Sequence, residues 1–380
     1  MRLQIKQELL SATLTNLNKV TAPRSPTPAL RGILLETVEG KLLLNASDGE
    51  MTIRAWTPAE IIQPGKILLP ADSLTELVRR LEPGILELEE ERTEEGAGVI
   101  LRWKNGQTRI WIMEAENYPP LLEASGFATS FTSEELRLAM LKVLPAASRE
   151  EAPSKAILRG VHLTVVDEKL QSEATDGIRL AVWEKKTLPS KTQTAQFDAV
   201  LPLRAVLEFS RFSGREGEVF LSQDENHLVA QWTEDDTRYL LMARRVTGRY
   251  PNTHDYIPVN YCLRFRLPTA LFVAAVERAI IINKLDSQTY PVKIRVDGNQ
   301  NELVVMATSS SVGIHKERIT LDHWSGEPLE LAFNARFLLD GLKNNEEETT
   351  HFASAGVEGP AMITGEDTSC FYLLLPLRLG

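Results

Sequence analysis

The sequence has little cysteine, no long apolar run and no excess of positive charge. Its 380 residues include 2 cysteines, Cys262 and Cys370, which lie far apart and belong to no CxxC pair. A disulfide framework or a structural zinc site therefore has little support, and we expect two buried thiols. The longest apolar run, Cys370 to Leu377, spans eight residues, whereas about 18 are needed to cross a bilayer. The sequence predicts no membrane span.

The start of the chain and its charge restrict the class of protein further. The first eight residues read as a strand leading into a helix and hold no apolar core of signal-peptide length, which predicts a cytoplasmic protein. Lys and Arg number 42 against 52 Asp and Glu, a net charge of −10. Phosphate binding requires an excess of Lys and Arg wherever contact is made, so this balance excludes a protein that coats nucleic acid with its whole surface. A local basic face remains compatible with it.

Motifs that carry catalysis are missing. The six histidines show no HExxH or other ligand spacing, and there is no Walker glycine loop, no GxGxxG after a strand and no GxSxG elbow. Asp48-Gly49 and Asp176-Gly177 stand between alternating apolar runs and indicate tight turns rather than catalytic aspartates. The acidic run Glu87–Glu95 indicates a solvated hairpin. We expect no enzyme activity, no metal and no cofactor, while a hydrolase with an unrecognised site stays an alternative.

An internal repeat organises the chain. Leu30-Arg31-Gly32 precedes Asp48-Gly49, Leu158-Arg159-Gly160 precedes Asp176-Gly177, and the two copies of each motif are 128 residues apart. Each Asp-Gly turn is followed by an alternating strand, a connection and a Leu-Pro step that opens a helix. A third, weaker copy fills the remainder of the chain, so three copies of about 128 residues account for 380.

The repeat predicts three domains, 1–124, 125–258 and 259–380, with boundaries near 123–128 and 257–262 where Pro and Gly cluster with polar residues. Each copy reads strand, helix, several strands, helix, several strands. This order is typical of an α+β fold with antiparallel sheets and helices segregated to one face. Apolar residues at helical spacing predict helices over 7–19, 71–81, 133–144, 203–212, 269–281 and 335–343.

The predicted helices differ in charge from the rest of the chain. They contain ten Lys and Arg against eight Asp and Glu, so they sum to +2 and the remainder sums to −12. A solvated amphipathic face of mixed charge accounts for so small an excess equally well.

At this level of detail the chain resembles the beta subunit of bacterial DNA polymerase III, the sliding clamp. Five motifs in the right order on a threefold repeat carry the resemblance: Leu30-Arg31-Gly32, Ala174 to Ala181, Gly248-Arg249-Tyr250-Pro251-Asn252, Phe333 to Asp340 and Leu375-Pro376-Leu377-Arg378-Leu379.

The resemblance implies three repeated DNA-clamp domains, each with antiparallel sheets outside and two helices inside. Two chains would close head to tail into a homodimeric ring around double-stranded DNA, without sequence specificity. Its implied partners are the replicative DNA polymerase catalytic subunit, the clamp loader and other proteins with clamp-binding motifs, and it involves no membrane. A weak inner excess of positive charge suits sliding, since the hold on DNA is topological. A clamp-fold interaction scaffold without DNA loading is the alternative, and the acidic Asp72 and Asp255 favour it.

The family's functional residues carry over position by position. The resemblance and the helix cations together predict DNA contacts at Arg24, Arg79, Arg80, Lys155, Arg204, Arg211, Asn334 and Arg336. A pocket for short partner peptides is implied at Leu158, Thr175, Gly177, Ile178, Arg179, Leu180, Pro251, Tyr256, Pro360, Leu373, Pro376, Leu377 and Arg378. The dimer interface is implied to join Ile110 and Ile112 to Ile281 and Ile282.

The sequence also departs from the family pattern. Asp72-Ser73 stands where the family has a basic pair, Asp255 where an arginine can occur, and Ile178 where the family often has His or Tyr. These departures leave the strength of DNA and peptide binding open.

Overall fold

The computed structural model describes residues 1–94, 96–116, 118–119, 129–166, 169–186, 197–212, 217–283 and 290–378. The predicted boundary at 123–128 and the last residue of the predicted acidic hairpin, Glu95, lie outside the described residues. None of the helices in the described ranges combines the length and the hydropathy that a membrane crossing requires.

The contacts within the chain form two compact units, which are described separately. Unit 1 comprises Met1–Arg137 and Pro189–Arg245, and unit 2 comprises Leu138–Leu188 and Val246–Gly380. The second repeat is thus divided between the units. The physical reason is strand pairing, because sheets cross the repeat boundaries: strand Thr237–Arg244 of the second repeat pairs with Met51–Pro58 of the first, and Arg179–Lys186 pairs with Cys370–Leu374 of the third.

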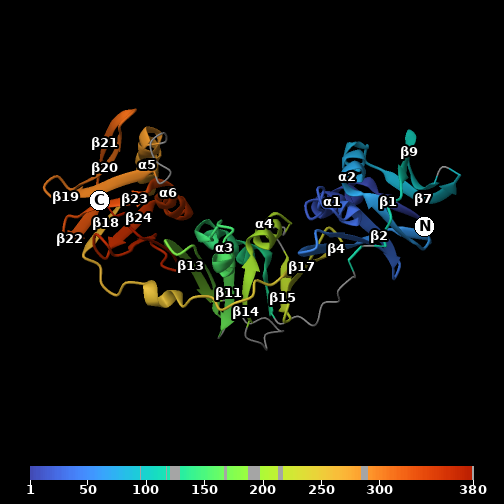
Figure 1. Cartoon of the computed structure of the whole chain (residues 1–380), viewed down its shortest axis with the longest axis horizontal. Helices are drawn as coiled ribbons and strands as arrows, with labels where there is room; N and C mark the ends of the chain where they lie inside the picture. Colours follow the sequence, from blue (N-terminus) through green and yellow to red (C-terminus); the bar gives the residue numbers. More distant parts are fainter. Residues whose placement is uncertain are drawn as a thin grey trace. The chain divides into compact units, whose positions relative to one another are not determined.

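Among its described residues, unit 1 contains three complete α-helices and two antiparallel sheets, which Figure 1 labels in part. Its elements are β1 (Arg2–Lys6), α1 (Gln7–Asn18), η1 (Pro28–Arg31), β2 (Gly32–Val38), β3 (Lys41–Ser47), β4 (Met51–Pro58), β5 (Glu60–Gln63), β6 (Lys66–Pro70), α2 (Ala71–Arg80), β7 (Ile85–Thr93), β8 (Gly96–Trp103), β9 (Gly106–Trp111), β10 (Thr129–Thr132), β14 (Phe197–Pro202), α4 (Leu203–Phe212), β15 (Glu218–Gln223), β16 (His227–Glu234) and β17 (Thr237–Arg244). The strand orders are β5-β1-β7-β8-β9 and β10-β15-β16-β17-β4-β3-β2-β6. Helix α3 (Ser133–Val143) contains the division between the units.

In the part of unit 2 that the structure describes, two α-helices lie wholly within the unit. Its elements are η2 (Leu144–Ala146), η3 (Pro153–Leu158), β11 (Gly160–Val166), β12 (Lys169–Thr175), β13 (Arg179–Lys186), η4 (Thr253–Tyr256), β18 (Leu263–Pro268), α5 (Thr269–Asn283), β19 (Pro291–Asp297), β20 (Glu302–Ser309), β21 (Gly313–Thr320), β22 (His323–Gly326), β23 (Glu330–Asn334), α6 (Ala335–Asn344), β24 (Thr349–Ser354), β25 (Ala361–Thr364) and β26 (Cys370–Leu374). One sheet runs β11-β12-β13-β26-β25-β24-β18-β22 within the unit, and a second runs β21-β20-β19-β23.

The six predicted helices are confirmed among the described residues, with ends that shift by one or two positions. Three of them start directly after a strand that ends in proline, at Pro70, Pro202 and Pro268. Proline lacks the N–H that a strand ladder needs, and a helix's first turn has no use for one, so this residue suits the switch between the two. Helix α3 instead begins with a capping box, in which Thr132 Oγ1 accepts from the Glu135 N–H at 3.2 Å and donates to its carboxylate at 3.0 Å.

The helices cover one face of each large sheet. In unit 1, Leu10, Leu14 and Leu17 of α1 are fully buried, and Trp232 of β16 stacks on Tyr239 of β17 with ring centroids 5.3 Å apart. Trp232 also meets Phe209 of α4 edge-on. The equivalent core of unit 2 is a set of packed rings from both of its sheets and α5, formed by Phe265, Phe272, Phe333 and Phe352.

The acidic segment of β7 forms a hairpin with β8, as predicted, and carboxylates of this strand form ion pairs with arginines. Arg2 lies 2.6 Å from Glu87, and Arg102 lies 2.5 Å from Glu89. The two cysteines are free, and each is partly rather than fully buried. Burial raises the pKa of the Cys370 thiol to about 11, which keeps it protonated and unreactive at neutral pH.

Candidate partner pocket and DNA-facing residues

Unit 2 contains a pocket of about 340 Å³ where most of the predicted partner-pocket residues meet. Ten of the thirteen line it, namely Leu158, Thr175, Gly177, Ile178, Arg179, Leu180, Pro251, Tyr256, Pro360 and Leu373. They come from four separate segments, which are η3, the β12–β13 turn with the start of β13, the stretch through η4, and the β24–β26 region. A largely apolar concave site that gathers residues from distant segments is the usual form of a ligand or peptide pocket.

The end of the chain differs from the prediction. Pro376, Leu377 and Arg378 do not line the described pocket, and their places are taken by Leu374 and Leu375. The backbone explains this. The Leu375 N–H donates to the Ile178 carbonyl at 2.9 Å, and the Leu377 N–H donates to the Ala332 carbonyl at 2.7 Å. The second bond joins the end of the chain to β23.

Two pocket side chains are exposed although they are large and apolar. Ile178 is 46% exposed and Tyr256 is 63% exposed, whereas Leu180 and Leu373 behind them are buried. Exposed apolar groups beside a cavity are available to a ligand without any rearrangement. One repeat earlier, the position of Ile178 is occupied by Glu50, which pairs with Arg244 at 3.6 Å. The two junctions between repeats therefore differ in polarity.

The tight Asp-Gly turn that supports the pocket is held by its own aspartate. Asp176 Oδ1 accepts from the N–H groups of Ile178 and Arg179 at 2.9 and 3.1 Å. Gly177 has φ +91°, a left-handed conformation that glycine adopts without strain. Asp48 and Gly49 repeat this arrangement in unit 1. Both Asp-Gly steps are thus turns, and their aspartates are occupied by backbone donors.

Arg179 joins the turn to the third repeat. Its guanidinium donates to Asp176 at 2.9 Å, to Asp340 of α6 at 2.5 Å and to the Tyr372 hydroxyl of β26 at 3.1 Å. It also lies over the Phe337 ring, 3.9 Å from the centroid. Burial by itself lowers the pKa of Arg179, but Tyr372, Asp340 and Asp176 together raise it above its ordinary value. The side chain is permanently charged and committed to this network.

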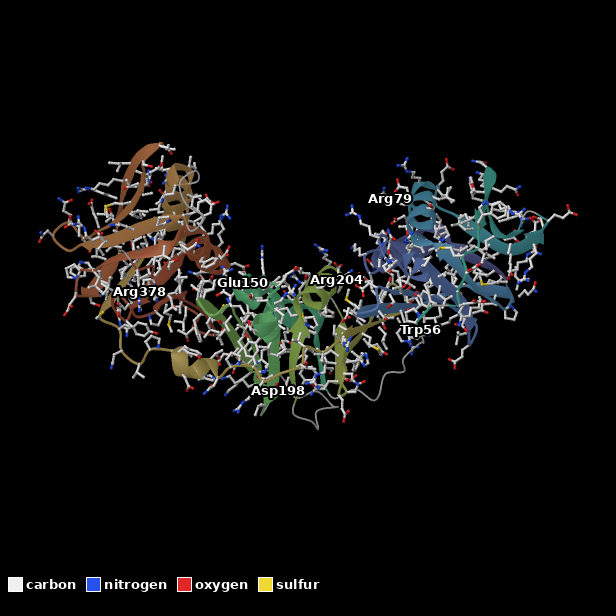
Figure 2. The ribbon with its side chains drawn as sticks, in the orientation of Figure 1. Trp56, Arg79, Glu150, Asp198, Arg204 and Arg378 are labelled. Atoms are coloured by element: carbon white, nitrogen blue, oxygen red, sulfur yellow. The ribbon has the colours of Figure 1, made fainter. Side chains whose placement is uncertain are left out.

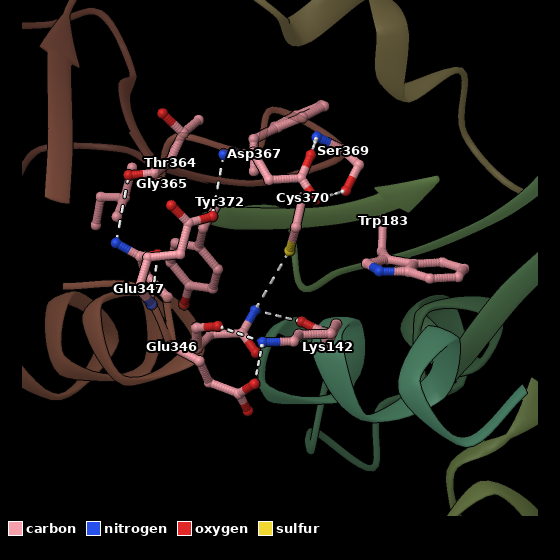
Figure 3. A pocket seen from close by; sticks show the side chains of 15 residues that line it. Lys142, Trp183, Glu346, Glu347, Thr364, Gly365, Asp367, Ser369, Cys370 and Tyr372 are labelled. Carbon is pink, nitrogen blue, oxygen red and sulfur yellow. Dashed lines mark hydrogen bonds and ion pairs between the residues drawn. The ribbon is translucent and has the colours of Figure 1, made fainter. Parts of the chain in front are cut away.

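A second cavity of unit 2, of about 210 Å³, lies at the ends of α3 and α6 (Figure 3). Lys142 Nζ donates to the Asn344 carbonyl at 2.9 Å, and Asn344 Nδ2 donates to the Lys142 carbonyl at 2.5 Å. Lys142 also pairs with Glu346 at 3.1 Å, while Glu347 accepts from the Asp367 N–H at 3.0 Å. The polar groups of this cavity bind one another, and the paired bonds between Lys142 and Asn344 connect the end of α3 to the end of α6.

The predicted DNA contacts in unit 1 are surface cations. Arg24 is exposed between α1 and η1. Arg79 and Arg80, at the end of α2, share the carboxylate of Glu76 at 2.6 and 2.5 Å. The remaining two belong to α4, where Arg204 pairs with Asp48 and Arg211 pairs with Glu208. Figure 2 shows Arg79 and Arg204 extending from their helices.

The three predicted contacts in unit 2 are more varied. Lys155, in η3, pairs with Glu150 at 2.9 Å. Asn334 caps helix α6, because its Oδ1 accepts from the Arg336 N–H at 3.0 Å. Arg336 lies over the ring of Tyr290 and donates to its hydroxyl at 2.6 Å. Asn334 therefore has a structural role of its own. Asp72, the departure in α2, accepts a hydrogen bond from Asn18 at 3.0 Å.

The predicted interface residues lie near sheet edges. Strand β9 ends one sheet of unit 1, and β21 ends one sheet of unit 2. Ile110 is buried in unit 1 with 7% exposure, while its neighbour Trp111 is 50% exposed and lines a groove of about 410 Å³ with it. Ile281 is 66% exposed, and Ile112 and Ile282 are half-buried. Two further apolar side chains near these edges were not among the predicted residues: Trp111 of β9, and Ile314 of β21, which is 79% exposed.

Comparison with known proteins identifies the family. Models of the N-terminal, central and C-terminal domains of the DNA polymerase III beta subunit match residues 1–122, 131–252 and 255–378. The beta sliding clamp of Synechococcus elongatus is 28% identical over 386 residues, which cover 100% of both chains. That of Chlamydia pneumoniae is 25% identical over 382 residues, which cover 100% of this chain and 99% of the relative.

The fold agrees with solved structures. The DNA polymerase sliding clamp of Bacillus subtilis matches with a TM-score of 0.90 at 24% identity, over 100% of both chains. The beta subunit from the DNA polymerase of Streptococcus pyogenes matches with a TM-score of 0.89 at 23% identity, again over 100% of both. The predicted α+β fold of three clamp domains is confirmed. Three family models in succession cover nearly the whole chain, and the chain therefore belongs to the DNA polymerase III beta subunit family, the beta sliding clamps.

Proposed function

We propose that two copies of this sliding clamp close head to tail into a ring that encircles duplex DNA and tethers the replicative polymerase to it. The observation that carries the proposal is the unbroken succession of three clamp domains, since a six-domain ring needs all three from each chain. The clamp acts in the cytoplasm by holding DNA and partners together, and it catalyses no step. The clamp loader places it on DNA.

The two sheet edges support a head-to-tail dimer. An edge strand presents unpaired N–H and C=O groups that another strand can extend. Strands β9 and β21 are such edges, and each carries an exposed apolar residue, Trp111 and Ile314. Joining β9 of one copy to β21 of the other pairs both edges and covers Ile281 together with them. Because each copy offers one edge of each kind, two copies form two identical interfaces and close the ring.

The surface cations suit a clamp that slides. Arg79 and Arg80 already pair with Glu76, and all three side chains are exposed. Exposed pairs of this kind are worth about 0–1 kcal/mol, so a phosphate can replace the carboxylate at little cost and leave again. Arg211 is exposed as well, although its partner Glu208 is buried. Weak, non-directional attraction of this kind does not fix the DNA in one register.

A topological test separates a clamp from a scaffold with the same fold. Fluorescent protein is loaded onto nicked circular plasmid by the clamp loader, and the plasmid is then cut once. We expect protein to comigrate with circles and to be lost from linear DNA, but to stay on linear DNA whose biotinylated ends are blocked with streptavidin. Equal retention on open linear and circular DNA contradicts encirclement. A protein that never loads onto circles supports the scaffold alternative.

We propose that the pocket of unit 2 receives an apolar peptide segment of the polymerase and of other partners. Ile178→Ala and Tyr256→Ala should each weaken binding of a labelled polymerase peptide about tenfold, because each removes roughly 1–2 kcal/mol of apolar contact. Leu271→Ala is the matched control, since Leu271 is 51% exposed on α5. Fluorescence anisotropy measures the affinities. Unchanged binding in both pocket variants, or an equal loss in the control, contradicts the assignment.

Deleting Leu375–Gly380 is a stricter test. It removes Leu375 from the pocket wall and the hydrogen bond from Leu377 to Ala332. We expect polymerase stimulation to be abolished while the dimer mass in sedimentation stays unchanged. Unchanged stimulation contradicts the pocket assignment.

A further inference from the structure

A further groove of unit 2, with a volume of about 610 Å³, runs along β18, β22, β24, β25 and β26 of the large sheet, and we call the face that carries it the outer face. Four basic side chains line it: Arg264 and Arg266 of β18, His323 of β22 and His351 of β24. The described lining residues include no carboxylate. In a chain whose net charge is −10, such a concentration of basic groups in one concave surface selects for a negatively charged ligand.

The strand register places the four basic residues together. Arg264 and Arg266 alternate with the buried Leu263, Phe265 and Leu267, so both point to the outer face. Arg266 lies directly opposite His323 on one neighbouring strand and opposite His351 on the other. Three basic residues thus form a row across three strands, with Arg264 in the adjacent row.

Both arginines are available. They are exposed, and neither guanidinium forms an ion pair with the described part of the chain. Arg264 lies over the ring of Tyr261 at 4.8 Å from the centroid, a contact that orients it without neutralising it. Of the row, His351 pairs with Glu366 at 3.1 Å, and the Glu366 side chain is 68% exposed. The arginines therefore keep their charge for a ligand.

The groove is continuous with the partner pocket. Leu180, Val182 and Leu373 form an apolar cluster on this face, against which Met362 and Phe371 pack. Leu180 and Leu373 line the pocket, whereas Met362 and Phe371 line the groove. Along one cross-strand row, Leu373 is followed by Met362, Ala353 and Arg264. Three strand spacings of about 4.8 Å place Arg264 roughly 14 Å from Leu373, the length of four or five extended residues.

We propose that this groove binds an acidic segment of the same partner chain whose apolar residues enter the pocket. The inference rests on the proposed pocket and adds a second contact to it. An acidic stretch starting next to the apolar anchor reaches Arg264 and Arg266 in extended form. A protein segment fits better than nucleic acid, because the floor between the two sites is an apolar sheet surface that matches alternating side chains.

The test compares two tails on one anchor. A labelled peptide with the clamp-binding segment of the replicative polymerase is extended, at either end, by four Glu or by four Gln. With the intact protein in low salt, we expect the Glu tail at one end to bind about three- to tenfold tighter than the Gln tail, as two exposed ion pairs provide. The advantage should shrink in 0.5 M salt, because salt at this concentration screens the attraction between the Glu tail and the arginines.

Two double variants decide whether the groove is responsible. Arg264→Gln/Arg266→Gln should abolish the preference for the Glu tail and leave Gln-tailed binding unchanged. Lys293→Gln/Arg295→Gln is the matched control, because it removes two cations at the same spacing from β19 in the other sheet of unit 2. The preference should persist in the control. A preference that survives in the first variant, or that disappears equally in both, overturns the proposal.

Failure of the pocket and failure of the groove give different results. If the Gln-tailed peptide ignores Ile178→Ala and Tyr256→Ala, the pocket assignment is wrong. In that case a deca-glutamate peptide without an anchor still tests the groove. Weaker binding to the Arg264 and Arg266 double variant than to the control double variant supports the groove as an acidic-peptide site. Equal binding to the two double variants overturns it. Single-stranded oligothymidine serves as the nucleic-acid probe. If its binding is lost in the Arg264 and Arg266 double variant while binding of the Glu-tailed peptide is not, the choice of a protein ligand is overturned.

Discussion

The network around Arg179 makes a prediction that the structure allows to be worked through. We consider Arg179→Met, which keeps an unbranched apolar stem of similar shape and removes the charged guanidinium. The guanidinium is 7% exposed and makes three hydrogen bonds, to Asp176, Asp340 and Tyr372. Asp340 is 44% exposed and returns to water, but the Tyr372 hydroxyl is buried and loses this partner.

The expected cost follows from these exposures. Removing one partner of a buried charged pair costs about 3–5 kcal/mol, and an unsatisfied buried hydroxyl accounts for roughly 1–3 kcal/mol of that. The half-exposed Asp340 reduces the total, so we expect about 3 kcal/mol. Asp340→Asn, which weakens only one half-exposed contact, should cost about 1 kcal/mol. The two values together test whether burial of the network or the number of its charges sets its strength.

Hydrogen exchange followed by mass spectrometry measures this loss locally, which is necessary because a chain of several domains does not unfold in one step. A loss of about 3 kcal/mol raises exchange in β13, β26 and α6 by roughly 100-fold. Peptides of β7 and β8 in unit 1 serve as the internal reference. Arg318→Met, at an exposed arginine paired with Glu302, should change exchange by less than about threefold. Equal protection in Arg179→Met and Arg318→Met would refute the reasoning.

Three further predictions concern the interface, the pH response and the backbone. Trp111→Ala should weaken the dimer at least tenfold in analytical ultracentrifugation, because Trp111 is half-exposed at an edge strand; an unchanged dimer contradicts the proposed interface. The hydrogen bond from Arg102 lowers the pKa of Glu89 below its ordinary value of 4.5, so this pair stabilises the fold above that pH and the contribution is lost as the pH falls through the lowered pKa. Hydrogen-exchange protection of β7 and β8 in Glu89→Gln should therefore fall less between pH 5 and pH 3 than in the unaltered protein, and an equal fall refutes this. Gly326 has φ +97° and an added Cβ there would collide with the Cys262 carbonyl, so Gly326→Ala should cost about 2–3 kcal/mol of local stability, measured by hydrogen exchange in β18 and β22, and a cost below about 0.5 kcal/mol contradicts the strain.

Most of the fold could be predicted from local pattern. The helices follow from apolar spacing and the Leu-Pro steps, and the Asp-Gly turns follow from the two residues themselves. Asp48 and Asp176 both accept backbone N–H groups two and three residues on, a local arrangement that needs no partner from elsewhere. The pairing of sheets across repeats was not predicted, because a sequence repeat does not say which strand will extend the sheet of the next copy.

The pocket lining agrees with the family resemblance except at the last residues of the chain. Ten of the thirteen positions that the family resemblance implied line one pocket. Leu374 and Leu375 also line it, while Pro376, Leu377 and Arg378 do not, and the Leu377 N–H is bonded to the Ala332 carbonyl instead. That bond joins positions 45 apart in sequence, and no local signal announces it.

For the candidate DNA and interface residues too, the sequence indicates the type of residue, and only the structure shows its contacts and its exposure. The sequence could identify the cations of the helices, but it could not show that Asn334 caps α6 or that Glu76 forms ion pairs with two arginines. Among the apolar residues of β9, exposure selects Trp111 over Ile110, since alternate side chains of a strand point to opposite faces and only the sheet decides which face is covered.

The sequence by itself determined the repeat, the helices, the turns and the family, because these depend on the order of residues over short spans. The tertiary structure alone decided which side chains share a surface. Arg264, Arg266, His323 and His351 are scattered over 88 positions and form one basic groove only because β22, β18 and β24 pair in a fixed register. Long-range strand pairing sets that register, and it is the physical step that a linear pattern does not contain.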